Sequence, residues 1–172
     1  MTDAKRETFK IRDARAEELD AVAAVMAAAY EQYEPAFPSE GWRAYANDIA
    51  NVRSRLKEAE LIVAVRGGQV AGAVTFYPDG SVQGWPRAWA SIRLLAVHPD
   101  SRGLGVGRAL TQECIRRCRE RRIATVGLHT TEAMSVARRM YERMGFKRAP
   151  EFDFQPSREV AVMAYRQELA AG

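Results

Sequence analysis

Apolar residues recur at two spacings along the 172-residue chain, and these spacings separate predicted helices from predicted strands. A period of 3.6 residues predicts helices, and short apolar runs or alternation predict strands. The helical segments are 16–33, 39–56, 106–122 and 134–144. The strand segments are 9–12, 61–65, 70–77, 89–97, 124–130, 146–154 and 160–165. The order is strand, two helices, three strands, helix, strand, helix and two strands, which makes this an α/β chain.

Local signals predict where several of these segments begin and end. Asp13 is a candidate N-cap for the first helix, Gly67-Gly68 marks a hairpin, and Gly145 ends the last helix. The second helix is expected to bury five apolar side chains: Trp42, Tyr45, Ile49, Val52 and Leu56. No internal repeat, linker or low-complexity segment interrupts the pattern, so residues 1–172 are expected to form a single domain.

Composition is typical of a soluble globular protein, with 47% apolar and 28% charged residues. No apolar run approaches the ~20 residues of a membrane helix. The N-terminal segment is polar and has no signal-peptide core, so we expect a cytoplasmic protein without a membrane partner. Cys114 and Cys118 fall on the apolar stripe of their helix and are expected in the core. Together with His98 and His129, they show no metal-ligand spacing.

Charge is distributed unevenly along the chain. Residues 1–60 hold 9 Lys and Arg against 12 Asp and Glu, whereas residues 61–172 hold 17 against 10. A basic excess is compatible with nucleic acid as a partner. However, the arginines of residues 106–144 are scattered over predicted helix faces rather than gathered in one patch. We therefore do not expect a nucleic-acid partner.

The most informative segment follows the strand that ends in Leu95-Ala96-Val97. After a Pro turn come Arg102, Gly103, Leu104, Gly105, Val106, Gly107 and Arg108, and then a helix begins. A glycine loop that opens a helix presents backbone N–H groups and positive potential to a phosphate, and arginines add charge-assisted hydrogen bonds. The pattern therefore indicates a pyrophosphate site, although a tight turn without ligand is an open alternative. Both the P-loop and the GxGxxG fingerprint fail here, because Arg108 follows the last glycine.

The remaining pattern, R-x-x-G-x-G over 102–107, resembles the acyl-coenzyme A signature of the GNAT superfamily of N-acetyltransferases. A second motif, Ala137-x-x-x-Tyr141-x-x-x-Gly145-Phe146, resembles the family's later helix and strand. The order of elements also matches this family over nearly the whole chain. The resemblance implies a GNAT (acyl-CoA N-acyltransferase) fold: an α/β mixed central sheet of six to seven strands with about four helices. It also implies acetyl-CoA as cofactor, with coenzyme A as product, and no metal.

The resemblance assigns roles to particular residues. Leu95, Ala96 and Val97 would pair with the pantetheine arm through their backbone, and the N–H of Val97 would stabilise the oxyanion. Tyr141 matches the position of the general acid. Arg102, Gly103, Leu104, Gly105, Val106, Gly107 and Arg108 would hold the pyrophosphate. Met134 stands where many members have Asn, so Ser135 is the candidate for that contact with the cofactor.

The resemblance leaves the base and the acceptor open. Residues 89–94 contain no carboxylate for a general base, so a water chain or a carboxylate from elsewhere must serve. Candidates are Glu31, Glu34 and Glu40, in the acidic and aromatic loop that borders the acceptor in this fold. That loop suits a cationic amine, either a small molecule or a peptide. Two other activities stay open: a non-catalytic acyl-CoA sensor, and acetylation of protein N-termini or lysines. Dimers are frequent in this family, so a homodimer is a further expectation.

Overall fold

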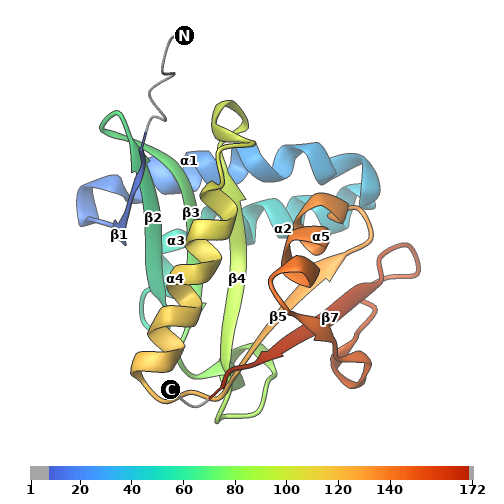
Figure 1. The fold of residues 1–172 in the computed structure, drawn as a ribbon. Helices are drawn as coiled ribbons and strands as arrows, with labels where there is room; N and C mark the ends of the chain where they lie inside the picture. Colours follow the sequence, from blue (N-terminus) through green and yellow to red (C-terminus); the bar gives the residue numbers. More distant parts are fainter. Residues whose placement is uncertain (1–7, 171–172) are drawn as a thin grey trace, which may run out of the picture.

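A seven-stranded mixed sheet lies at the centre of the computed structural model, which describes residues 8–170 (Figure 1). The strands are β1 (Lys10–Asp13), β2 (Glu60–Arg66), β3 (Gln69–Tyr77), β4 (Ala90–Val97), β5 (Thr125–Thr131), β6 (Lys147–Arg148) and β7 (Val162–Glu168). Their order across the sheet is β1-β2-β3-β4-β5-β7-β6. All neighbours are antiparallel except β4 and β5, which are parallel.

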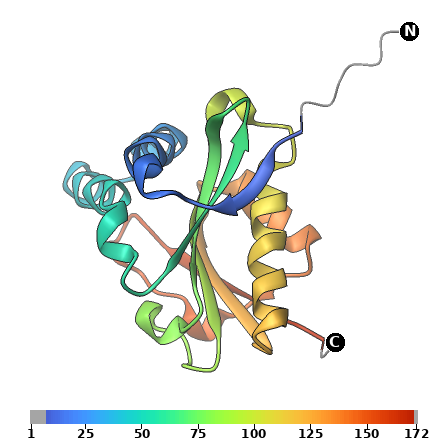
Figure 2. The same cartoon turned by 90° about the vertical axis from the view of Figure 1, so that its left-hand side faces the viewer.

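Helices cover both faces of this sheet (Figure 2). On one face lie α1 (Leu19–Tyr30), α2 (Ser39–Ala50) and the single turn α3 (Val52–Arg55). On the other lie α4 (Val106–Glu120) and α5 (Ser135–Arg143). The α/β architecture with a mixed central sheet that the sequence predicts is confirmed, with seven strands and five helices among the described residues. Within the same residues, no helix has the length and apolar character needed to cross a bilayer.

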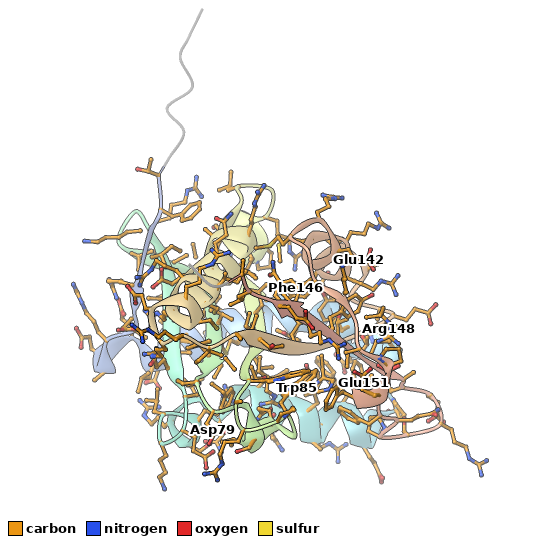
Figure 3. All side chains as sticks on the ribbon, turned by 60° about the horizontal axis from the view of Figure 1, so that its bottom comes forward. Asp79, Trp85, Glu142, Phe146, Arg148 and Glu151 are labelled. Carbon is orange, nitrogen blue, oxygen red and sulfur yellow. The ribbon has the colours of Figure 1, made fainter. Side chains whose placement is uncertain are left out.

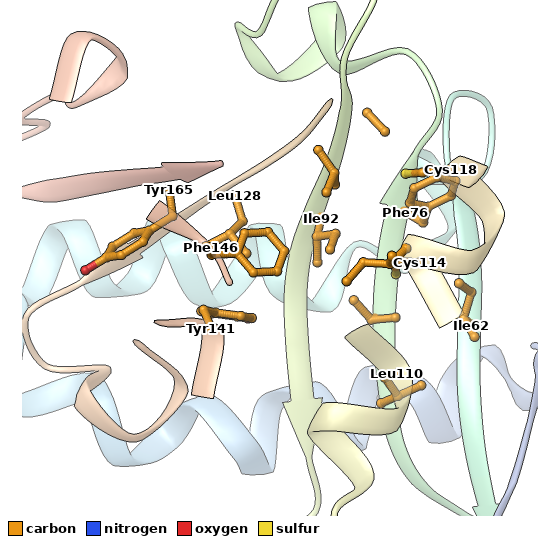
Figure 4. Close-up of a cluster of buried hydrophobic side chains, with 14 of the residues drawn as sticks. Ile62, Phe76, Ile92, Leu110, Cys114, Cys118, Leu128, Tyr141, Phe146 and Tyr165 are labelled. Atoms are coloured by element: carbon orange, nitrogen blue, oxygen red, sulfur yellow. The ribbon is translucent and has the colours of Figure 1, made fainter. Parts of the chain in front are cut away.

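The core on the α4 side joins helices and strands across the middle of the sheet (Figure 4). Leu110 and Cys114 of α4 pack against Phe76 and Ile92, and none of these four side chains is more than 3% exposed. Cys114 and Cys118 are fully buried and unbonded, so their predicted place in the core is confirmed.

The sheet splits between its two parallel strands. Residues 90–92 of β4 pair with 126–128 of β5, and beyond Ile92 no pairing continues. At the same point the pairing of β4 with β3 shifts by one residue between Ala73 and Thr75. Leu94, in this bulge, has a φ of +54°, a conformation that costs a non-glycine residue ~1–2 kcal/mol. The strained bulge turns β4 away from β5, and the two strands diverge in Figure 1.

Two predicted features of the first helix are wrong. Asp13 does not cap it; Asp13 ends β1, and its carboxylate accepts a hydrogen bond from Arg117 at 2.7 Å. The capping acceptor is Glu18, whose carboxylate binds the backbone N–H of Arg15 at 2.8 Å. The predicted continuation to residue 33 is a 3₁₀ turn over Glu31–Ala36 with Pro35 inside it, because proline removes a backbone donor.

Two later segments also differ from the prediction. The second helix breaks at Asn51, where ψ is +61°, and Leu56 beyond the break is 43% exposed rather than buried. The strand predicted over 146–154 is interrupted: Lys147–Arg148 pairs with β7 as β6, and Phe154 forms an isolated bridge with Val162 at the start of β7. Pro150 then starts a 3₁₀ turn, since it cannot donate to the sheet.

Candidate active site

A cleft of about 610 Å³ opens where β4 and β5 separate. Its walls come from β4 and β5, from the glycine loop with the first turn of α4, from α5, and from the end of α1 with the 3₁₀ turn that follows it. Ten of the predicted site residues line this cleft: Leu95, Val97, Arg102, Gly103, Gly105, Val106, Gly107, Arg108, Ser135 and Tyr141. Segments far apart in the sequence are thus brought to one place.

Two other predicted site residues lie outside the lining. Ala96 pairs with Ala73, and its side chain packs on the opposite face of the sheet with α1. Leu104 is 45% exposed at the tip of the loop. Neither residue is among those that line the cleft.

The glycine loop presents a concave strip of backbone to the cleft. Gly103 and Gly105 have φ values of +79° and +82°, and Leu104 between them does not share this conformation. Alternation of this kind turns successive N–H groups toward one point and forms an anion-binding nest. The first N–H groups of α4 follow directly, and they have no carbonyl partner within the helix. The loop can therefore hold a pyrophosphate group through its main chain.

Arginine side chains add positive charge around this nest. Arg102, Arg108 and Arg143 line the cleft. Within residues 8–170, none of the three has an ion-pair partner. Their guanidinium groups are free to donate charge-assisted hydrogen bonds to an anion.

The exposed edge of β4 offers a second set of backbone groups. The N–H of His98 donates to the carbonyl of Ala71 on β3 at 2.8 Å. Because N–H groups alternate in direction along an antiparallel ladder, the N–H of Val97 points away from β3, toward the split. An extended arm in the cleft can therefore pair with β4 there, where β5 no longer does.

Tyr141 on α5 lines the same cleft from the opposite side. It is 6% exposed and its ring meets Phe146 edge-on at 5.6 Å (Figure 4). Burial raises the pKa of its hydroxyl above the usual value of 10, so this group carries its proton at neutral pH. A protonated phenol beside the cleft can donate a hydrogen bond or a proton.

A second cavity of about 660 Å³ lies against the sheet face that α1 and α2 cover. Its walls include Tyr30, Phe37 and Tyr45 from the helical side and residues 154–162 from the loop before β7. Two carboxylates, Glu40 and Glu159, also line it and are exposed to solvent. Glu31 and Glu34, the other candidates from the sequence, are exposed and line neither cavity.

The two cavities meet through the split in the sheet. Seven residues line both of them: Tyr30, Ile92, Arg93, Leu94, His129, Thr130 and Met134. A molecule held in the first cavity can therefore meet a molecule held in the second within van der Waals reach of these residues. Arg93, at this junction, forms an ion pair with Asp48 of α2, which neutralises its charge.

Sequence reasoning missed Arg93, Leu94 and His129 as residues of the site. The bulge at Leu94 depends on a positive φ. A positive φ is expected at glycine rather than at leucine, so the sequence did not predict it. His129 is one of two histidines, and without metal-ligand spacing it gave no signal. Alternation along each strand groups Ser91 with Arg93 and Gly127 with His129. Only the pairing of Ser91 with Gly127, which the sequence does not reveal, places Arg93 and His129 on the same sheet face.

Comparison of the chain with models of known protein families finds a match to a family of acetyltransferases. The model of the "Acetyltransferase (GNAT) family" matches residues 22–146. Mycothiol acetyltransferase of Cellulomonas flavigena is 35% identical over 111 residues, covering 58% of this chain and 31% of that protein. N-acetyltransferase 8B of Mus musculus is 31% identical over 110 residues, covering 63% of this chain and 46% of that one. The chain thus spans less than half the length of either relative.

Solved structures share the fold at low sequence identity. A GNAT-family acetyltransferase of Staphylococcus aureus superposes with a TM-score of 0.74 at 16% identity, covering 95% of this chain and 100% of that chain. The PaiA N-acetyltransferase of Thermoplasma acidophilum, in complex with coenzyme A, has a TM-score of 0.71 at 16% identity. That match covers 91% of this chain and 98% of that chain.

Proposed function

Because the chain belongs to the GNAT acetyltransferase family, we propose that it transfers acetyl from acetyl-coenzyme A to a primary amine in a ternary complex. One observation carries the proposal: two cavities, one lined by the glycine loop and α5 and the other by α2 and the loop before β7, meet at the split between β4 and β5. A thioester in the first cavity and an amine in the second then react directly, because the protein holds both at one point.

The residues of the first cavity fit the coenzyme. The nest at Gly103 and Gly105, with the N-terminus of α4, suits the pyrophosphate. The free edge of β4 suits the amide-bearing pantetheine arm, and the N–H of Val97 suits the oxyanion that forms at the thioester carbonyl. Tyr141 donates a proton to the departing thiolate.

Turnover separates this function from its main alternative, a non-catalytic acyl-CoA sensor. We expect calorimetry to show acetyl-coenzyme A binding at micromolar to submillimolar strength, with NAD and ATP far weaker. Timed release of coenzyme A thiol with a panel of amines should then exceed hydrolysis without amine. Binding without amine-dependent release would favour the sensor, and equal affinity for ATP would contradict the coenzyme site.

The acceptor belongs to the amines, but its kind is a separate question. The matched relatives are named for mycothiol and for N-acetyl transfer, and one solved neighbour is named a ribosomal-protein-alanine N-acetyltransferase. A small amine and a peptide N-terminus or lysine both suit a cavity of about 660 Å³. The amine panel should therefore include short peptides beside small amines.

The first prediction concerns the anion site. Arg102→Ala removes an unpaired cation that lines the cleft, and we expect the Kd for coenzyme A to rise about tenfold. The expected rise in Kd is no larger than this because Arg102 is exposed, and solvent screens its charge. Arg139→Ala is the matched control, since Arg139 is exposed on α5 outside the lining. Equal calorimetric affinities of both variants and the unaltered protein would place the pyrophosphate elsewhere.

The second prediction concerns acceptor charge. Arg93 is neutralised by Asp48, so the acceptor cavity keeps the two negative charges of Glu40 and Glu159. We expect kcat/KM to favour an amine with an additional positive charge over a matched amine with a carboxylate. The preference should fade between ~0.01 M and ~0.5 M salt, because exposed charges are screened. The double variant Glu40→Gln/Glu159→Gln should lose it mainly through KM.

The matched control for the acceptor-charge test is Glu31→Gln/Glu34→Gln, which changes net charge equally but leaves the cavity lining intact. This variant should keep the preference for the cationic amine. If both double variants lose the preference to the same degree, long-range attraction rather than the cavity selects the acceptor. A preference of the unaltered protein for the carboxylate-bearing amine would reject the cationic acceptor.

A further inference from the structure

The reaction needs a group that takes a proton from the attacking amine, and this group must lie where the two cavities meet. Three of the seven residues that line both cavities are ionisable: Tyr30, Arg93 and His129. Arg93 keeps its proton throughout the physiological range. Burial raises the pKa of Tyr30 well above 10, so this phenol is also protonated. His129 is the ionisable residue at the junction whose neutral form can accept a proton.

The surroundings of His129 fix its ring and its tautomer. Its Nε2 lies 3.1 Å from the carbonyl oxygen of Phe152, an acceptor, so Nε2 must carry hydrogen and donate it. Within residues 8–170, no hydrogen bond to Nδ1 is formed. The lone pair of Nδ1 is therefore available. When Nδ1 takes a proton, the bond from Nε2 to the carbonyl remains and stabilises the imidazolium.

Trp85 supports the ring from one face. The two rings stack with centroids 4.6 Å apart and an angle of 29° between their planes. Trp85 is 3% exposed, and its label in Figure 3 marks this part of the molecule. It lies directly on the backbone of Gly127, where an added Cβ would come within 2.7 Å of the indole. Phe154 meets the imidazole edge-on at 5.2 Å.

We propose that His129 accepts the proton of the attacking amine through Nδ1, and that Trp85 is the positioning residue that holds its ring. The assignment rests on the proposed function. The amine nitrogen bonds to the thioester carbon, and its proton passes to Nδ1 directly or through one water. The carbon–sulfur bond then breaks, and the sulfur takes the proton of Tyr141. Solvent finally removes the proton from the imidazolium and restores the phenol, so one thiol and one amide result.

Charges around His129 leave its neutral form in place at neutral pH. Burial lowers the pKa of His129 below 6.5, against smaller opposing effects of the Phe152 carbonyl and Asp153. The charged groups of the surrounding elements occur mainly as pairs: Asp153 with Arg148, Glu151 with Arg166, and Arg93 with Asp48. Glu159 is exposed at the cavity wall. Activity should therefore be present at neutral pH and fall as pH drops through a pKa below 6.5.

The test is the pH profile of kcat/KM, measured as thiol release from acetyl-coenzyme A with the best amine of the panel. Ionisation of the amine itself lowers kcat/KM below the pKa of the amine. In the unaltered protein, a further acidic limb at lower pH should coincide with the pKa of His129 measured by NMR titration. His129→Gln should lose about 10²-fold or more in kcat at pH 7 and lose this limb. Its deficit should shrink at high pH, where the amine arrives unprotonated. The Kd for acetyl-coenzyme A should not change.

Variants of Trp85 test whether this residue positions His129, and the measured quantities are kcat and the pH of the acidic limb. Trp85→Leu should lower kcat and move the acidic limb up toward 6.5, because water reaches the ring. Trp85→Phe should keep most of kcat and an acidic limb close to that of the unaltered protein, because an aromatic ring still packs on the imidazole. His98→Gln, a change of the other histidine, should keep the acidic limb. Melting curves should be measured for each variant to check that it folds.

Three results would count against the assignment. Unaltered kcat and pH profile in a folded His129→Gln would overturn His129 as the proton acceptor. A His129 pKa, measured by NMR in the unaltered protein, that does not match the acidic limb would overturn it even if the variant fails to fold. Absence of amine-dependent turnover in the unaltered protein would instead overturn the proposed function, and the base with it.

Discussion

Tyr141→Phe should lower kcat by ~10²-fold or more while the Kd for acetyl-coenzyme A stays nearly unchanged. The substitution keeps the ring, which packs against Phe146 at 5.6 Å, and deletes only the hydroxyl. The thiolate then leaves without a proton donor. Burial raises the pKa of this hydroxyl, so it carries its proton wherever the reaction runs.

Single-turnover thiol release at saturating acetyl-coenzyme A measures this step. Tyr165→Phe is the matched control, because Tyr165 belongs to the same core cluster but its hydroxyl donates to Glu142 at 2.8 Å. That variant should keep its turnover. If Tyr141→Phe turns over as the unaltered protein does, Tyr141 serves only as a core aromatic on the apolar side of α5.

The two motifs that sequence reasoning found are local, and local motifs could be predicted. The loop 102–107 and the helix α5 are short continuous stretches. Within such stretches the spacing of residues predicts which groups face the same cleft. Apolar periodicity also predicted core residues, because it placed Cys114 and Cys118 on the buried side of their helix, where both are found. Whether residues 1–172 act as one domain in the complete protein stays a prediction.

The junction of the two cavities could not be predicted, because it depends on pairing between distant strands. Arg93 and His129 come together only through the register of β4 with β5, 36 residues apart in sequence at Ile92 and Leu128. The bulge at Leu94 breaks the alternation that a sequence pattern assumes. Asp13 failed as a cap for a similar reason, since its partner Arg117 comes from α4. Contacts of this kind depend on tertiary structure, which outweighs local preference.

Gly105→Val should raise the Kd for coenzyme A by tenfold to ~100-fold, the largest effect expected on binding. Gly105 has a φ of +82°, and a β-branched residue cannot hold this conformation without strain. The loop would rearrange and turn its N–H groups away from the pyrophosphate, each charge-assisted bond being worth ~1.5–3 kcal/mol. An added Cβ at Gly105 meets no protein atom within 4 Å, so crowding of the protein itself is not the cause.

Gly68→Val separates strain from lost binding. Gly68 lies in the hairpin turn between β2 and β3, has a φ of +76°, and also has open space around an added Cβ. Both variants should therefore lose similar melting temperature, while Gly105→Val alone loses affinity. At saturating acetyl-coenzyme A, Gly105→Val should recover most of its kcat, because the groups at the sheet split are unchanged and the loss lies in KM. Equal loss of affinity in both variants would mean that general destabilisation, rather than the nest, controls binding.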